Sequence, residues 1–222
     1  MYSFPYFKEK DKQRLLQFLH DHPFAFLTGS FSNGKQVATQ IPVLVEDRDG
    51  ELFLQGHIMR RTDHFEAFCE NPQALVVFSG PHTYVSASWY TNPHIGSTWN
   101  YMSVHMRGTI NFMSDEDLVE LMKKLTLHFE DGNTQSPTIY DNLPEGFLKP
   151  MMPLIVGFEI KVLEMENVFK LSQNRDEKSY RTIISKLEKQ GGDSSLIATE
   201  MKNRLEELFP SNANGKENNL KS

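Results

Sequence analysis

The stretch FAFLTGSFSNGKQVATQIPVLVEDRDGELFLQGHI, residues 24–58, decides the fold of this 222-residue chain. It holds three runs rich in β-branched and aromatic residues, separated by Asn33-Gly34 and Asp49-Gly50. Both dipeptides favour tight hairpin turns, because their residues tolerate a positive φ. Alternate residues of the second run share one face of a strand: Val37, Thr39, Ile41, Val43 and Val45. The stretch predicts antiparallel strands joined by hairpins.

Further strands are predicted at residues 74–80, 99–113 and 154–165. The middle one alternates cleanly, with one face formed by Val104, Met106, Ile110 and Phe112. The opposite face carries His105, Arg107, Thr109 and Asn111. About six strands with mostly hairpin connections predict a closed or partly closed barrel, a mainly β fold with added helices (α+β), rather than a βαβ sheet.

Helical periodicity is found in residues 9–21, in residues 61–70 and after Ser114, which begins a sequence that resembles a capping box. Residues 131–153 contain four prolines and are predicted to be a loop. Two more helices are predicted on either side of Gly191-Gly192.

The second of these C-terminal helices carries apolar residues at helical spacing, from Ile197 to Leu208, and is expected to be capped by Ser194 or Ser195. We expect a barrel domain over residues 1–168, a helical segment packed on it over 169–209, and a disordered polar tail over 210–222.

The net charge is −6, from 23 basic and 29 acidic residues. This balance disfavours direct DNA binding, which depends on a basic surface. The single cysteine, Cys69, permits no disulfide within the chain, and no apolar run reaches the length of a signal peptide or a transmembrane helix. A soluble cytoplasmic protein without membrane contact is predicted. No metal site is expected, since His20 and His22 are too close in sequence to share a helix face.

The chain has none of the common nucleotide-binding, zinc-protease or serine-hydrolase motifs. Instead, a strand ends at Gly56-His57, and Arg60, Arg61 and Thr62 then open a short helix. Arginine donors beside a helix N-terminus suit a phosphate group. Alternatively, the arginines are solvated and pair with Asp63 or Glu66.

Aromatic residues gather in GPHTYVSASWYTNPHIGSTWNYMSVHMRG, residues 80–108, which holds both tryptophans, Trp89 and Trp99. Flat side chains with polar edges suit a planar heteroaromatic ligand, although they also suit a core or a dimer interface. A phosphate site combined with an aromatic slot points to a phosphorylated planar cofactor such as FMN.

These residues resemble the PaiB family, FMN-binding proteins named as negative transcriptional regulators. The resemblance extends from Met1 to about Phe209. It rests on MYSFPYF at the start, GH at 56–57, FSGPHTYVSASWY at 78–90, TWNYMSVHMRG at 98–108 and FKLSQNR at 169–175. The chain departs from the family pattern after Gly-His, where it reads IMRRTDHF, and at Ala87 and Ser97, where the family usually has proline.

The resemblance implies a split β-barrel of the pyridoxamine-phosphate oxidase and flavin reductase type, with FMN at the interface of a homodimer. The implied ring contacts are Thr39, Gln40 and Ile41. The implied ribityl contacts are Gly56 and His57, and the implied phosphate contacts are Arg60, Arg61 and Thr62. The residues implied to close the site, from the same or the other subunit, are Trp99, Asn100, Lys170, Ser172 and Gln173.

Three functions remain open from the sequence. The first is a regulator of the kind named by the family, acting through a ligand or a protein partner. The second is a flavin-dependent oxidoreductase or flavin reductase, for which His57 is the one acid–base candidate and no catalytic residue is assigned. The third is a module that holds haem or a nucleotide-like ligand without turnover, with candidate histidines His57, His82, His94 and His105.

Overall fold

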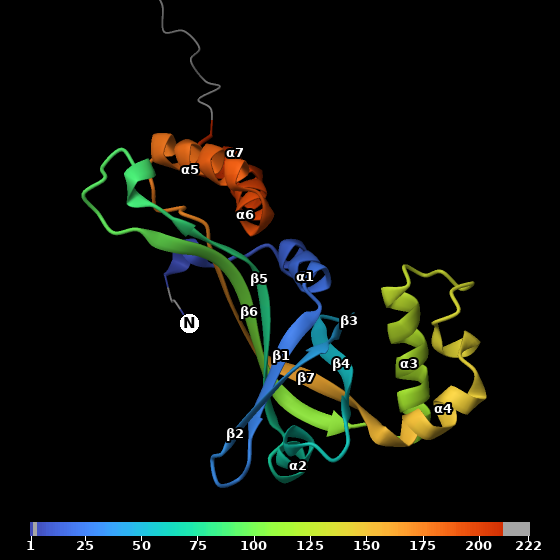
Figure 1. The fold of residues 1–222 in the computed structure, drawn as a ribbon. Helices are drawn as coiled ribbons and strands as arrows, with labels where there is room; N and C mark the ends of the chain where they lie inside the picture. The colour runs from blue at the N-terminus through green and yellow to red at the C-terminus, as the bar shows by residue number, and fades with distance from the viewer. Residues whose placement is uncertain (2–3, 211–222) are drawn as a thin grey trace, which may run out of the picture. The chain divides into compact units, whose positions relative to one another are not determined.

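The computed structural model describes Met1 and residues 4–210. Seven strands form one sheet in the order β2-β1-β5-β6-β7-β4-β3 (Figure 1). The strands are β1 (Phe24–Ser30), β2 (Gln36–Pro42), β3 (Leu44–Arg48), β4 (Glu51–Met59), β5 (Gln73–Val85), β6 (Thr98–Phe112) and β7 (Ile155–Lys170).

Both predicted hairpins are confirmed. β1 and β2 pair antiparallel from Phe24 opposite Pro42 to Ser30 opposite Gln36, and β3 and β4 pair antiparallel across Asp49-Gly50. Asp49 and Gly50 have φ of 54° and 91°, the left-handed backbone that this turn requires.

The sheet curls until its two ends approach each other. β2 and β3 occupy opposite ends of the strand order although only Val43 separates them in sequence, and β2 contacts β4. At Gly56 of β4, an added Cβ would lie 3.1 Å from the carbonyl oxygen of Pro42 and 2.8 Å from the Phe158 ring. Glycine is needed there because β4 runs so close to the end of β2.

The helices are α1 (Lys12–Asp21), α2 (Asp63–Glu70), α3 (Asp115–Phe129), α4 (Glu145–Met151), α5 (Glu177–Gln190), α6 (Gly192–Asn203) and α7 (Leu205–Leu208). Side-chain caps begin several of them. Thr62 accepts a hydrogen bond from the N–H of Phe65, and Ser114 accepts one from the N–H of Asp117, as its sequence predicts.

Three details of the helical predictions are wrong. Residues 131–153 include α4, because Pro144 precedes the helix as its N-cap and Pro150 is accommodated near its end. α6 is preceded by Gly191, at φ of 71°, while the Ser194 hydroxyl bonds to that of Thr83 and the Ser195 hydroxyl to the carbonyl of Gly192.

The third detail is the helix expected from Ile197 to Leu208, which breaks at Arg204 and continues as α7. Of the predicted disordered tail, residues 211–222 lie outside the described residues.

The chain divides into two compact units. The barrel unit contains residues 9–79 and 103–167, and the helical unit contains residues 1–8, 80–102 and 168–222. The chain passes from one unit to the other within β5, β6 and β7. The predicted domain division at residue 168 stays a prediction.

Each unit has its own buried core. In the barrel unit the fully buried residues include Leu27, Leu54, Phe78, Met106, Phe158 and Ile160. In the helical unit they include Tyr180, Ile183, Leu187, Ile197 and Met201. Tyr180 donates its hydroxyl to the carbonyl of Met201 at 3.0 Å, which joins α5 to α6. Within the described residues, no helix is long and apolar enough to cross a membrane.

Candidate functional site

The segment from Gly56 to Thr62 brings the predicted ribityl and phosphate residues together at the end of β4. Gly56 faces the barrel interior, against Phe158 and Pro42. Its neighbour His57 therefore projects to the opposite face of the sheet. Close packing inside the barrel explains the glycine without a ligand.

His57 lies on the face of the sheet that α3 covers. It pairs with Gly157 of β7, and an added Cβ on Gly157 would meet the Met113 sulfur at 3.0 Å and Leu121 at 3.3 Å. The Nδ1 atom of His57 is buried and has no hydrogen-bond partner within the described residues. Burial lowers the pKa of His57, so the ring is neutral near pH 7.

Arg60 is anchored to the barrel unit by both its backbone and its side chain. Its N–H donates to the carbonyl of Leu154 at 2.8 Å, and its Nε donates to the carbonyl of Ile155 at 3.0 Å. Its guanidinium also forms a 3.4 Å salt bridge with Asp115. These contacts tie the end of β4 to the start of β7 and to α3, so the side chain serves the fold.

Arg61 differs from Arg60 in backbone conformation, exposure and contacts. It has φ of 59° and is exposed. Within the described residues it forms no salt bridge, so the expected alternative of pairing with Asp63 or Glu66 is not seen, and Asp63 contacts His64 instead. Thr62 follows as the N-cap of α2 and donates its hydroxyl to the carbonyl of Met59 at 2.8 Å. A free guanidinium therefore stands beside a helix N-terminus.

The three predicted ring contacts on β2 do not share a face. Thr39 and Ile41 point into the barrel, where they pair with the buried Leu27 and Ala25. Gln40 points outward, opposite Phe26 of β1. Only Gln40 of the three offers an exposed side chain, while the backbone of all three remains part of the β1–β2 ladder.

Two phenylalanines on β1 share that outer face. Phe24 and Phe26 are 59% and 41% exposed, although the intervening Ala25 is fully buried. Phe26 pairs with Gln40 on one side and with Val77 of β5 on the other. An apolar patch of this kind on the outside of a sheet is typical of an interaction surface.

In the helical unit, Trp99 belongs to an exposed aromatic group. It is 54% exposed, and its ring centroid lies 6.0 Å from His82 and 6.1 Å from Tyr84. The group offers a surface for stacking. Trp89 and Tyr90 belong to the turn that follows β5, where Tyr90 is buried.

Asn100 and Ser172 are brought together by the structure, but they are buried. Ser172 donates its hydroxyl to Asn100 Oδ1 at 3.0 Å, and Asn100 Nδ2 contacts the Met201 sulfur at 3.6 Å. Gln173 uses both ends of its amide on its own turn, accepting from the N–H of Leu171 and donating to the carbonyl of Phe169. All three side chains are engaged in holding the turn after β7.

Lys170 is the remaining predicted residue of this group. It is partly buried and donates to the hydroxyl of Thr98. Burial, followed by the nearby charge of Arg175, lowers the pKa of Lys170. The cationic group is therefore held in a setting that disfavours positive charge.

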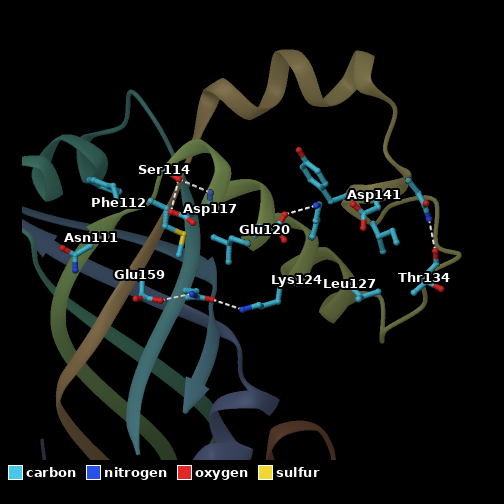
Figure 2. A pocket seen from close by; sticks show the side chains of 17 residues that line it. Asn111, Phe112, Ser114, Asp117, Glu120, Lys124, Leu127, Thr134, Asp141 and Glu159 are labelled. Carbon is cyan, nitrogen blue, oxygen red and sulfur yellow. Dashed lines mark hydrogen bonds and ion pairs between the residues drawn. The ribbon is translucent and has the colours of Figure 1, made fainter. Parts of the chain in front are cut away.

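A cleft of about 890 Å³ was not foreseen from the sequence. It is lined by β4, the end of β6, α3, residues 134–142 and β7, and Figure 2 shows its side chains. None of the predicted site residues lines it. Several of its polar groups are already engaged, for example Lys123 with Glu120 at 2.8 Å and Gln55 with Glu159 at 2.8 Å.

Sequence reasoning also passed over Arg175 and the hydroxyl of Tyr90. Both belong to motifs that the sequence singled out, and both have a buried polar atom without a partner in the described part of the chain. The available signal was a basic residue two positions after Gln173, which by itself reads as an ordinary surface charge.

Comparison with known proteins adds to this geometry. The family described as "Putative FMN-binding domain" matches residues 1–164. The chain is 30% identical over 203 residues to the protease synthase and sporulation protein PAI 2 of Bacillus subtilis (strain 168), which covers 90% of this chain and 96% of that protein.

Two solved structures share the fold. The FAD and heme binding protein from Mycobacterium smegmatis aligns with a TM-score of 0.56 at 19% identity, over 73% of each chain. The flavocytochrome Anf3 from Azotobacter vinelandii aligns with a TM-score of 0.54 at 17% identity, over 76% of this chain and 72% of that one. At these identities, the likeness is one of fold.

Proposed function

The chain belongs to the PaiB family, the FMN-binding family to which PAI 2 also belongs, and on that premise we propose that it is a homodimeric regulatory flavoprotein whose FMN phosphate is held by Arg61 and by the backbone N–H groups at the start of α2. The predicted α+β split-barrel fold is confirmed by this membership and by the shared fold, and the predicted FMN cofactor is confirmed by the family match. When bound, FMN supplies the electron-transfer chemistry of its ring, and the protein supplies binding and orientation.

The contrast between Arg60 and Arg61 carries the phosphate assignment. Arg60 is bonded to the carbonyl of Ile155 and to Asp115, whereas the left-handed Arg61 extends an exposed guanidinium with no carboxylate partner in the described residues. A guanidinium and the free N–H groups of a helix start both donate to phosphate oxygens. The residues present therefore fit the phosphate end of FMN.

Among the other predicted contacts, those with exposed side chains are the ones that we expect FMN to touch. Within the barrel unit, Gln40 is the exposed polar side chain that the flavin would meet. The Nδ1 of His57 is buried, and Gly56, Thr39, Ile41 and Arg60 serve the barrel itself. Of the helical-unit residues, Trp99 and Lys170 keep accessible groups, and their part in flavin binding stays a prediction.

The test is a flavin fluorescence titration of the wild type and Arg61→Gly. Glycine suits φ of 59°, so the variant removes the guanidinium without straining the backbone. Loss of charge-assisted hydrogen bonds, each contributing about 1.5–3 kcal/mol, should weaken FMN binding by about tenfold or more. Arg107→Gln is the matched control, because Arg107 is an exposed arginine of the same unit that pairs with Glu166.

Equal FMN affinity for the wild type and Arg61→Gly would reject the phosphate assignment. A wild type that leaves flavin fluorescence unchanged would instead count against flavin binding altogether. The two outcomes are distinguished in the same titration, because the wild-type curve is measured first.

Homodimerisation is supported by the outer face of β1. Phe24 and Phe26 expose aromatic rings beside Gln40, a side chain predicted to contact the ring. Burying such a patch against a second copy would remove apolar surface from water, at about 25 cal/mol per Å². A flavin bound close to that face would couple its occupancy to assembly.

For the regulatory role, we propose action through the flavin or a protein partner rather than by direct DNA contact. The net charge of −6 offers no general attraction for a phosphate backbone. The name of the Bacillus subtilis relative refers to protease synthesis and sporulation, which is the regulatory context that the proposal adopts. The alternatives of a flavin reductase and of a haem- or nucleotide-holding module stay predictions.

A further inference from the structure

Arg175 and Tyr90 of the helical unit share an unusual condition. The Nε of Arg175 and the hydroxyl of Tyr90 are both buried, and neither has a hydrogen-bond partner within the described residues. Tyr90 is only 7% exposed. Buried polar atoms without partners are rare, because burial removes their hydrogen bonds to water without replacing them. Two such atoms side by side therefore indicate a site for a ligand that accepts or donates these hydrogen bonds.

The two side chains lie against each other. The guanidinium carbon of Arg175 is 4.4 Å from the centroid of the Tyr90 ring. Burial raises the pKa of the Tyr90 hydroxyl, and the positive charge and the nearby N–H donors of Arg175 work against that effect, although no hydrogen bond of good geometry forms between the two side chains. The hydroxyl therefore stays protonated at neutral pH and can act as a hydrogen-bond donor beside a cation.

A second cation lies nearby. Lys170 donates to the hydroxyl of Thr98, and its ammonium group is 5.9 Å from the centroid of the Phe7 ring. Its pKa is lowered by burial and then by Arg175, so the two positive charges repel each other across a partly dehydrated space. An anion placed between them would relieve that repulsion.

The neighbouring carboxylate is already committed elsewhere. Asp176 accepts hydrogen bonds from the N–H and hydroxyl of Ser179, at 2.9 and 2.6 Å, and from the hydroxyl of Thr91 at 2.8 Å. These bonds hold its pKa at about 2, so it is fully ionised but turned toward the start of α5. Arg175 and Arg61 are the arginines of the described chain that form no salt bridge.

The backbone that carries these groups is fixed in advance. Ser172 has φ of 62°, and the N–H of Arg175 donates to its carbonyl at 3.0 Å. The buried bond from Ser172 to Asn100 and the two amide bonds of Gln173 close the same turn. A donor set that is already held in place gains affinity, because little order is lost on binding.

We propose that Arg175 and Tyr90, with Lys170 and Thr98 beside them, form an oxyanion-binding site in the helical unit. The ligand is a phosphate or carboxylate group with at least two acceptor oxygens, one for Arg175 Nε and one for the Tyr90 hydroxyl. The site shares no residue with the phosphate assignment to Arg61, which lies in the barrel unit.

The experiment uses the full-length protein and inorganic phosphate as the probe. Phosphate binding is measured by titration calorimetry for the wild type, Arg175→Gln, Tyr90→Phe and Arg181→Gln, at constant ionic strength. Arg175→Gln should bind at least tenfold more weakly, because a charged donor is lost. Arg181→Gln is the matched control and should bind as the wild type does, since Arg181 is an exposed helical-unit arginine paired with Glu177.

Tyr90→Phe gives a second, independent signature. Removing a hydroxyl that lacks a partner should leave the melting temperature in chloride unchanged or raise it, while phosphate binding weakens several-fold. This variant also keeps the proposal testable if Arg175→Gln fails to fold. A Tyr90→Phe protein with a lower melting temperature and unchanged phosphate affinity would overturn the site, as would a wild type that binds no phosphate in the millimolar range.

Repeating the titration with FMN-saturated protein identifies the source of the oxyanion. If FMN abolishes phosphate binding, the site receives the phosphate of the flavin, and the assignment of that phosphate to Arg61 is overturned. If both bind together, it receives an anionic group of another small molecule. Either result supports the site, whereas equal phosphate affinity in the wild type and Arg175→Gln would reject it.

Discussion

At the scale of single residues, His57 couples the fold to pH. Its Nδ1 is buried without a partner in the described residues, and its face of the sheet is covered by Leu118, Leu121 and Met113. Burial opposes the charged imidazolium, so the folded protein holds this proton less tightly than the unfolded chain does.

The sign of the pH dependence follows from that lowered pKa. Above the ordinary histidine pKa of 6.5, His57 is neutral in both the folded and the unfolded protein, so its protonation costs no stability. As the pH falls below 6.5, the unfolded chain takes up the proton first, so stability falls until the pH passes the lowered folded pKa. The wild type should therefore lose melting temperature as the pH falls below the ordinary histidine value of 6.5.

His57→Gln removes the titrating group and should flatten this part of the curve. His94→Gln, which changes an exposed histidine, should leave the wild-type slope in place. Melting curves at a series of pH values make the comparison, and the same slope in His57→Gln and the wild type would show that another group is responsible.

Residue roles were harder to predict than residue locations. Arg60 and Arg61 are adjacent and chemically identical in the sequence, yet one is bonded to Ile155 and Asp115 and the other is exposed at positive φ. Asn100 and Ser172 stand in motifs that suggest a ligand, yet they bond to each other inside the helical unit. Such differences depend on which groups a distant segment brings close, and no local pattern records that.

At the scale of elements, β6 and β7 approach closely at Gly108. An added Cβ there would lie 2.1 Å from the carbonyl oxygen of Lys161 and 2.7 Å from a methyl group of Ile160. The obstacle is largely backbone, which cannot move without disturbing the strand ladder. Glycine is the residue that permits this crossing of the two longest strands of the sheet.

Gly108→Ala should therefore destabilise the protein severely, by about 3 kcal/mol or more. Gly146→Ala is the matched control, because no atom lies within 4 Å of its added Cβ and alanine favours helix α4. Urea denaturation of both variants gives the comparison. A Gly108→Ala protein as stable as the control would mean that the strands separate freely at this point.

Most elements with strong local signals were predicted correctly. The exception is the run from Val37 to Val45, which was predicted as one strand but is divided at Val43 into β2 and β3. The two hairpins, the alternation in β6 and the cap at Ser114 are fixed by neighbouring residues. α4 was missed because prolines usually end helices, whereas Pro144 begins this one. The strand order was beyond the sequence pattern, since pairing of β7 with β4 joins residues about a hundred positions apart.

At the scale of the whole molecule, the exposed phenylalanines of β1 are the basis for assembly. Phe24 and Phe26 point outward, while Ala25 and Leu27 between and after them fill the barrel. A second copy that covers this face would bury two aromatic rings at the centre of an interface, where aromatic residues contribute most.

Phe26→Glu should convert the predicted dimer to a monomer, because a buried carboxylate without a partner opposes association. Phe147→Glu changes another exposed phenylalanine, on α4, and should leave the assembly unchanged. Sedimentation velocity reports both masses. A dimeric Phe26→Glu protein would place the interface elsewhere, and a monomeric wild type would remove the dimer from the proposal.

The interleaving of the two units has a consequence for anyone who trims or fuses the gene. The family match ends at residue 164, which invites a shortened clone, yet residues 80–102 have their partners in the segment after Val168. Thr91 would lose Ser179 and Asp176, Thr83 would lose Ser194, and Asn100 would lose Ser172. In the truncated protein, residues 80–102 would lack these hydrogen-bond partners, so expression should be planned for the chain through at least Phe209.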